Sequence, residues 1–341
     1  MPTKDNVIDA RAEALPPRRV GHSGALLWGA LGIVAFSLTL PATKIAVRSI
    51  DAQLVGLGRA LVAATCALLL LLITRQPLPP RRLWWPLGVV ALGVVLGFPL
   101  LSAIALRSVP SSHAAIVVGL LPAANALTAV WRARERPSPG FWIASVVGFA
   151  AIVVFCATHG LGSLQGADLL LLGAVLAAAV GYTEGALLAR ELGAWQVICW
   201  ALVLSAPLFA PFVGARLWAV GFNPSAQSLG GFAYVSLISM FLGFFAWYRG
   251  LALGGIARIG QLQLMQPILT LLWSHWLLAE AITLMHLITA AVVLISVSSA
   301  LRLRSQRRSD VFRPHADTQH LRGPALQPRE AIDQLEREGY R

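Results

Sequence analysis

Charged residues are scarce in this sequence. Only 12% of its 341 residues are Asp, Glu, Lys or Arg, and the 15 acidic residues are outnumbered by 27 basic ones. Soluble domains carry about 25% charged residues, so this chain lacks the side chains for a water-facing surface. Hydrophobic residues make up 57%, and the mean hydropathy is +0.71. These values exclude a soluble globular domain and predict a lipid bilayer as the solvent.

Cysteine and the common enzyme motifs are also scarce. The three cysteines, Cys66, Cys156 and Cys199, lie in apolar runs without the spacing of metal ligands, where cysteine acts as a small hydrophobe. The sequence has no zinc-binding pair of histidines on one helix face, no phosphate-binding glycine loop with its Lys, and no nucleophile elbow. We therefore expect no catalytic residues, no metal and no cofactor.

The formal net charge of +12 raises the question of nucleic acid. The basic residues stand at the ends of apolar runs and in the two tails, without the interleaved aromatic residues on which bases stack. This distribution predicts contact with a membrane and no nucleic-acid partner.

Ten apolar segments are each long enough to cross a hydrocarbon core of roughly 30 Å. In lipid they must be helices, because no water is present to hydrogen-bond an open backbone. The fold class is therefore an all-α membrane protein with ten transmembrane helices. The predicted spans are residues 23–47, 52–73, 83–106, 111–133, 140–157, 168–188, 195–213, 229–252, 256–278 and 284–303.

An internal repeat divides the chain in two. Pro122 and Glu135 recur 145 positions later as Pro267 and Glu280, each pair in an apolar segment that ends at its glutamate. Weaker matches at nearly the same offset, such as Leu106 with Leu251, keep the order of the chain. Repeats of this size are typical of transporters.

The repeat predicts blocks at residues 23–158 and 165–303, with tails at 1–22 and 304–341. Because each block holds five helices, an odd number, the two blocks should be inverted relative to each other. Arg and Lys gather in alternate loops and in both tails, so both termini are predicted in the cytoplasm.

The two prolines are expected to interrupt hydrogen bonding inside their helices and to leave the carbonyls of Val118 and Gln263 without partners. The later helix also carries a polar stripe at steps of three and four residues, formed by Gln263, Gln266, Pro267, Thr270 and Ser274. In the earlier helix the same face holds Pro122 and Asn125 among apolar residues. We interpret the two faces as unequal walls of a binding cavity, with helix-to-helix hydrogen bonding as the alternative.

Arg59, Glu184 and Lys44 are ionisable side chains inside predicted spans that could take part in transport. Arg59 is about 10 Å deep at 1.5 Å per residue, and should face a carboxylate, a carbonyl or a substrate anion unless it extends to the outer interface. Glu184 is a candidate for carrying a proton or binding an amine, and pairing with Arg190 or lipid headgroups is the alternative. For Lys44 we favour extension to the interface. We expect Glu135 and Glu280 to cap the helix that follows each of them.

These features, together with the segment WGALGIVAFSLTLPATK at residues 28–44, resemble the drug/metabolite transporter superfamily and, within it, bacterial EamA-type exporters. The resemblance covers residues 27–303 and implies a basket in which the first four helices of each block surround a cavity. It also implies alternating access and the export of amino acids, other metabolites or toxic compounds, often coupled to protons. Arg59 falls where the family often has an arginine, whereas the polar RARERPS context of Glu135 departs from the family pattern.

The resulting hypothesis is a secondary transporter that exports a small organic molecule across the cytoplasmic membrane, with the proton as a candidate coupling ion. A membrane scaffold that uses the basic C-terminal tail is the alternative. The sequence does not indicate an oligomeric state. The candidate substrate-binding residues are Ser37, Arg59, Phe98, Pro122, Asn125, Tyr182, Glu184, Trp247, Gln263, Gln266, Pro267 and Thr270.

Overall fold

The computed structural model describes residues 22–133, 139–159, 166–254 and 259–311, and every regular element within them is helical, with no strand. The all-α prediction is confirmed. Most of both predicted tails and Glu135 lie outside the described residues.

Fourteen α-helices follow one another in the described part of the chain. They are α1 (His22–Ser37), α2 (Thr39–Ala46), α3 (Arg59–Ile73), α4 (Trp84–Val90), α5 (Phe98–Ala105), α6 (Ser111–Val118), α7 (Leu121–Ala133), α8 (Pro139–His159), α9 (Gly166–Leu188), α10 (Ala194–Val220), α11 (Ala226–Ala233), α12 (Gly243–Gly254), α14 (Gln266–Leu278) and α15 (Leu284–Val311). Three π-helical stretches, Leu54–Gly58, Ala91–Gly97 and Tyr234–Leu242, connect some of them into longer rods.

Seven helical segments among the described residues are long and apolar enough to cross a bilayer. They are Gly24–Ala46, Leu54–Ile73, Arg81–Ala105, Ser111–Arg132, Gly166–Leu188, Ala194–Val220 and Ala226–Gly254. Two further predicted spans hold shorter apolar helices, Trp142–Phe155 and Leu284–Ser296, and the span at 256–278 is interrupted. Each predicted span therefore contains helix, while the total of ten crossings stays a prediction.

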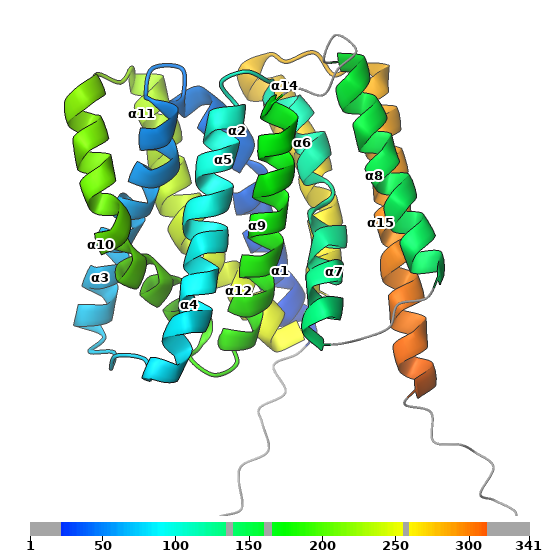
Figure 1. Cartoon of the computed structure of the whole chain (residues 1–341), viewed down its shortest axis with the longest axis horizontal. Helices are drawn as coiled ribbons and strands as arrows, with labels where there is room; N and C mark the ends of the chain where they lie inside the picture. Colours follow the sequence, from blue (N-terminus) through cyan, green and yellow to red (C-terminus); the bar gives the residue numbers. More distant parts are fainter. Residues whose placement is uncertain (1–21, 134–138, 160–165, 255–258, 312–341) are drawn as a thin grey trace, which may run out of the picture.

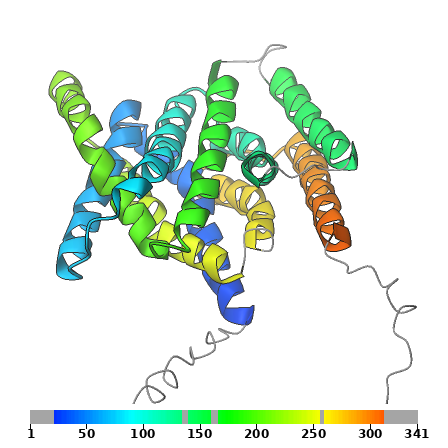
Figure 2. The same ribbon diagram turned by 60° about the horizontal axis from the view of Figure 1, so that its bottom comes forward.

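The two halves of the chain interleave in one bundle (Figure 1). Helix α1 packs on α12, α3 on α10, and α5 on α9, so each of these contacts joins the first half to the second. The fifth helices of the two halves, α8 and α15, pack on each other at one side of the bundle, as Figures 1 and 2 both show. This is the peripheral position that the family resemblance implies for them.

Glycines allow two of these contacts to be very close. A Cβ added at Gly250 would lie 2.7 Å from the backbone nitrogen of Gly29, and one at Gly93 would lie 2.8 Å from the Cα of Gly181. These glycines join α12 to α1 and the π-helical stretch Ala91–Gly97 to α9. The backbones of the two halves therefore touch without intervening side chains.

The prolines do not lie inside continuous α-helices, which corrects the expectation from sequence. Pro122 is in the first turn of α7, after a break at Gly119 and Leu120, and Pro267 is in the first turn of α14, after a 3₁₀-helix at Gly260–Met265. The first turn tolerates proline because its N–H has no partner within the helix. The carbonyl of Gln263, expected to lack a partner, accepts a hydrogen bond from the Gln266 N–H.

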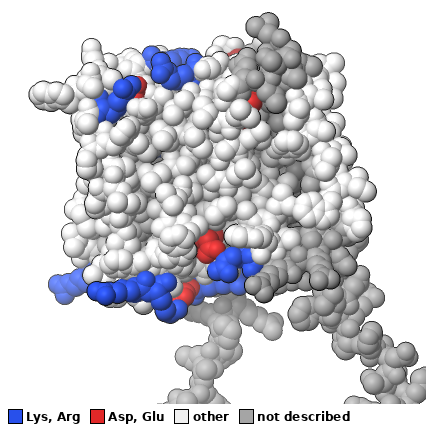
Figure 3. All heavy atoms as spheres, in the orientation of Figure 1, with Lys and Arg blue, Asp and Glu red and all other residues white. Residues whose placement is uncertain are grey.

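The first residue of α1 and the last residue of α15 lie at the same end of the bundle, which is the lower end in Figure 1. We call this the basal end and the opposite one the apical end. Figure 3 shows a band of Lys and Arg along the basal end and a smaller group at the apical end. The apolar surface between them is the expected contact with lipid.

Candidate functional site

The centre of the bundle contains a buried arginine. Arg59 is the first residue of α3, directly after the π-helical stretch Leu54–Gly58, and its exposed fraction is 1%. Its Nε and Nη1 atoms have no hydrogen-bond partner among the described residues. The side chain therefore faces the interior, and the alternative of extension to the interface is wrong.

Arg59 lines a small cavity formed by both halves of the chain. The space open to the centre of a water molecule is about 20 Å³, which is room for one water. The lining residues are Phe36, Thr39, Arg59, Val94 and Phe98 from the first half, and Ala178, Tyr182, Ser239, Met240, Phe244 and Gln266 from the second. Four of the candidates from sequence, Arg59, Phe98, Tyr182 and Gln266, thus meet at one cavity.

Aromatic rings form one wall of this cavity. The ring of Phe36 lies 6.2 Å from that of Tyr182 and 5.0 Å from that of Phe244, measured between centroids. Trp247, another candidate, lies 6.2 Å from Tyr182 and backs this wall. The spacings are those of favourable aromatic pairs, so the wall is a packed apolar surface beside a cation.

The polar part of the lining carries no acid. Thr39 and Ser239 face each other across the two halves with their hydroxyl oxygens 2.7 Å apart, and Gln266 adds an amide. No Asp or Glu is among the residues that line the cavity. Within the described parts of the chain, the charge of Arg59 therefore has no acidic side chain to balance it at this cavity.

Two other candidates connect helices instead of lining the cavity. The Thr270 hydroxyl donates to the carbonyl oxygen of Ser37 at 2.7 Å, and the indole N–H of Trp273 donates to the Ser37 hydroxyl at 3.0 Å. These bonds attach α14 to α1. For Ser37 and Thr270 the structure supports the helix-packing alternative.

The interrupted helices of the two halves meet through an amide pair. The Asn125 side-chain amide donates to Oε1 of Gln263 at 2.7 Å, while Oδ1 of Asn125 and Nε2 of Gln263 have no partner among the described residues. Pro122 and Pro267 are buried on the same two helical segments. The two interrupted helices therefore contact each other, and neither Asn125 nor Gln263 is among the residues that line the Arg59 cavity.

Glu184 lies in a separate groove at the basal end. Its carboxylate pairs with Nε of Arg132 at 2.7 Å, and the groove has a volume of about 530 Å³. The lining residues are Trp85, Pro86, Val89, Trp131, Arg132, Val180 and Glu184. Glu184 thus does not line the Arg59 cavity, and its described partner is Arg132 instead of Arg190.

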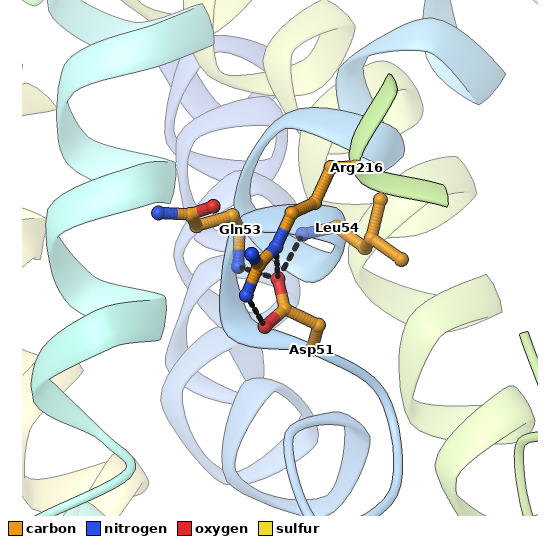
Figure 4. Close-up of polar contacts among 4 residues, drawn as sticks. All are labelled: Asp51, Gln53, Leu54 and Arg216. Atoms are coloured by element: carbon orange, nitrogen blue, oxygen red, sulfur yellow. Dashed lines mark hydrogen bonds and ion pairs between the residues drawn. The ribbon is translucent and has the colours of Figure 1, made fainter. Parts of the chain in front are cut away.

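Polar contacts at the apical end tie helix ends together. Asp51 forms two hydrogen bonds with Arg216 of α10, at 3.2 and 2.7 Å, and accepts from the backbone N–H groups of Gln53 and Leu54 (Figure 4). The Arg216 guanidinium holds the pKa of the Asp51 carboxyl below its usual range, with the backbone donors adding to the effect.

Lys44 extends from α2 to the loop that follows α5, between the predicted spans 83–106 and 111–133. Its ammonium donates to the carbonyl oxygens of Leu106, at 2.7 Å, and Val109, at 2.9 Å. Those carbonyls follow the end of α5, where a cation is favoured by the helix dipole.

Several relevant residues were not identified from sequence. Phe36 and Phe244 look like ordinary core residues in an apolar run, and only their place in the fold brings them to Arg59. The buried contact of 2.7 Å between His113 and Asp168 joins the first turns of α6 and α9. The sequence could have indicated this contact, because His113 and Asp168 are both polar residues near the start of a predicted span.

Comparison with known proteins gives the family. The EamA-like transporter family matches residues 23–157 and 165–302. The chain is 46% identical over 277 residues to the uncharacterized transporter YdeK of Bacillus subtilis, covering 80% of this chain and 96% of that protein. An uncharacterized transporter of Archaeoglobus fulgidus is 25% identical to this chain over 277 residues. The match covers 81% of this chain and 98% of that protein.

A solved crystal structure has the same fold. It aligns with a TM-score of 0.57 at 19% identity, over 82% of this chain and 99% of its own. The helical bundle, the two family matches and the relative from Bacillus subtilis agree with the resemblance seen in the sequence. The chain is a multi-pass membrane protein that belongs to the EamA-like transporter family of the drug/metabolite transporter superfamily.

Proposed function

We propose that this chain is a secondary transporter that carries a small organic molecule outward across the cytoplasmic membrane by alternating access. Membership of the family supports a membrane transporter. The single observation that best supports a central substrate site is Arg59, which is buried without a hydrogen-bond partner for two of its nitrogens where the two halves meet. Charged residues within membrane helices are costly and mark transport pathways.

The two hollows suggest a route. The cavity at Arg59 holds about 20 Å³, whereas the basal groove of about 530 Å³ is in the usual size range of ligand pockets. The band of basic residues supports a cytoplasmic position for the basal end. In this proposal both termini are cytoplasmic, and the substrate passes from the groove to Arg59 before leaving at the apical end.

The decisive experiment is a metabolite efflux screen in cells with and without the protein, repeated with Arg59→Gln and with Arg249→Gln as the control. Arg249 stands over the ring of Trp28 at 5.3 Å, away from the cavity. We expect one or more metabolites to leave faster with the wild-type chain and the control, and not with Arg59→Gln at equal membrane insertion. Equal efflux with and without the wild-type chain would overturn the proposal.

The same screen addresses the scaffold alternative. A chain that lacks residues 304–341 should export as fast as the full chain if those residues serve no transport role. Full activity of this shortened chain would argue against a scaffold, whose function would need the basic tail.

A further inference from the structure

We infer that the transported molecule is a monovalent organic anion, a carboxylate on a compact apolar body, and that Arg59 binds its carboxylate. This inference rests on the proposed transport function and narrows it. The sequence left three partners open for Arg59: a carboxylate of the chain, a backbone carbonyl or a substrate anion. The structure supports the last of these.

The charge of Arg59 is the first argument. Its Nε and Nη1 atoms have no partner, and no acidic side chain lines the cavity that it faces. A buried charge without a counter-charge is strongly destabilising. A bound anion would supply the counter-charge and accept hydrogen bonds from the guanidinium. A guanidinium is also the side chain best matched to a carboxylate, through charge-assisted hydrogen bonds.

The same lining disfavours amines. An ammonium group would need an acidic side chain to balance its charge, but the polar residues of the lining other than Arg59 are neutral: Thr39, Tyr182, Ser239 and Gln266. Glu184 lies in the separate basal groove and pairs with Arg132. Amino acids and cationic drugs are therefore poor candidates. A single cation in the lining also favours a single negative charge over a dianion.

The apolar lining defines the rest of the substrate. Phe36, Val94, Phe98, Met240 and Phe244 provide rings and aliphatic groups around the guanidinium, a pattern that suits a hydrophobic body with one polar group. Because the cavity has room for only one water, a substrate must displace some of these side chains. Phe98 stands directly after the π-helical stretch Ala91–Gly97, a kind of helical irregularity frequent at functional sites.

Three probes of nearly equal shape separate charge from size: benzoate, benzyl alcohol and benzylamine. The purified full-length chain in lipid nanodiscs is titrated with each, and binding is measured by the rise in melting temperature and by tryptophan fluorescence. A ligand that binds only the folded state stabilises it in proportion to the logarithm of its concentration. We expect benzoate to bind more tightly than benzyl alcohol, and benzylamine not to bind.

Three variants test whether Arg59 binds the carboxylate. Arg59→Gln should weaken benzoate binding by about tenfold to a hundredfold, the range for a lost charge-assisted hydrogen bond, and Arg59→Lys should weaken it less. Arg249→Gln should leave it unchanged. The Arg59→Gln protein should still melt cooperatively, because the substitution removes an unbalanced buried charge. If it does not fold, Arg59→Lys, which keeps the charge, provides the second test of the carboxylate contact.

The outcomes are distinct. The anion assignment is overturned if benzoate fails to bind, if benzylamine binds as well, or if Arg59→Gln binds benzoate unchanged. Export of a neutral or cationic metabolite without benzoate binding would retain the transport function and reject the anion. Benzoate binding that depends on Arg59, with no flux of any anion in reconstituted vesicles, would retain the anion site and reject transport.

Discussion

Glu280 caps the helix that begins at Ser111. Its carboxylate accepts from the backbone N–H of Ser111 at 2.9 Å and of Ser112 at 2.8 Å, and from the Ser111 hydroxyl at 3.1 Å. The contact joins the end of α14, in the second half of the chain, to the start of α6, in the first half. Ala279, in the left-handed conformation with φ of 54°, ends α14 just before Glu280. Capping was predicted from sequence, but the prediction that Glu280 caps the following helix is wrong.

Replacing Glu280 by Ala should destabilise the protein. The loss of a helix cap costs about 0.5–2 kcal/mol, and here the cap also links the two halves. The measurement is thermal unfolding in nanodiscs. Glu191, which pairs with exposed Arg82 at the basal end, is the matched control, since exposed pairs contribute about 0–1 kcal/mol. An equal decrease in melting temperature for Glu191→Ala would contradict this role.

The ion pair between Asp51 and Arg216 predicts a pH dependence. Because Arg216 lowers the pKa of the folded Asp51, this carboxylate adds stability above its unfolded pKa of about 3.9. That contribution is lost as the pH falls through the folded value. Compared with Asp51→Asn, the wild type should melt at a higher temperature at neutral pH. The difference should stay constant down to about pH 5 and then disappear.

The Asn variant is a strict comparison because its side-chain oxygen can still accept from the N–H groups of Gln53 and Leu54. In an Arg216→Gln background the advantage of Asp over Asn should fall at neutral pH. A difference in melting temperature that grows as the pH falls would contradict the assignment.

Substitution of Gly93 by Ala should weaken the packing of the two halves. The new Cβ would lie 2.5 Å from the carbonyl oxygen of Ala177, and such overpacking costs about 1–3 kcal/mol. Gly88 is in the same predicted span and has no atom within 4 Å of an added Cβ. Gly88→Ala should be neutral or stabilising by up to about 1 kcal/mol. Thermal unfolding of both variants tests this, and equal melting temperatures would argue against the close contact.

Glu184→Gln should remove the dependence of transport on a pH gradient if this carboxylate carries the coupling proton. Its position in the basal groove beside Arg132 allows exchange with the cytoplasmic solution in the proposed orientation. Flux of an exported metabolite in vesicles with and without an imposed gradient is the measurement, and Glu191→Gln is the control at the same end. Coupling that survives in Glu184→Gln would reject the role.

The helical architecture could be predicted because hydrophobicity and length determine spans in a bilayer. The fourth span of each half is a long apolar run that contains Pro122 or Pro267, and Arg59 is a charged residue well inside such a run. Both predictions use information that is local in the sequence.

Other features depend on contacts between distant helices. Thr270 and Gln266 are on the same predicted face, yet Thr270 bonds to Ser37 while Gln266 lines the cavity. Both residues lie in α14, so neighbouring positions on one helix face contact different parts of the bundle. Likewise, nothing local pairs Glu184 with Arg132 or Lys44 with the carbonyls beyond α5.

The π-helical stretches at Ala91–Gly97 and Tyr234–Leu242 occupy the third span of each half. A π turn bonds residue i to i+5, one residue more than an α turn. If one such turn converted to α, the side chains beyond it would swing by about 100° around the helix axis, one residue's share of a turn. Phe98, which directly follows Ala91–Gly97 and lines the Arg59 cavity, would then turn away from that cavity together with the rest of α5.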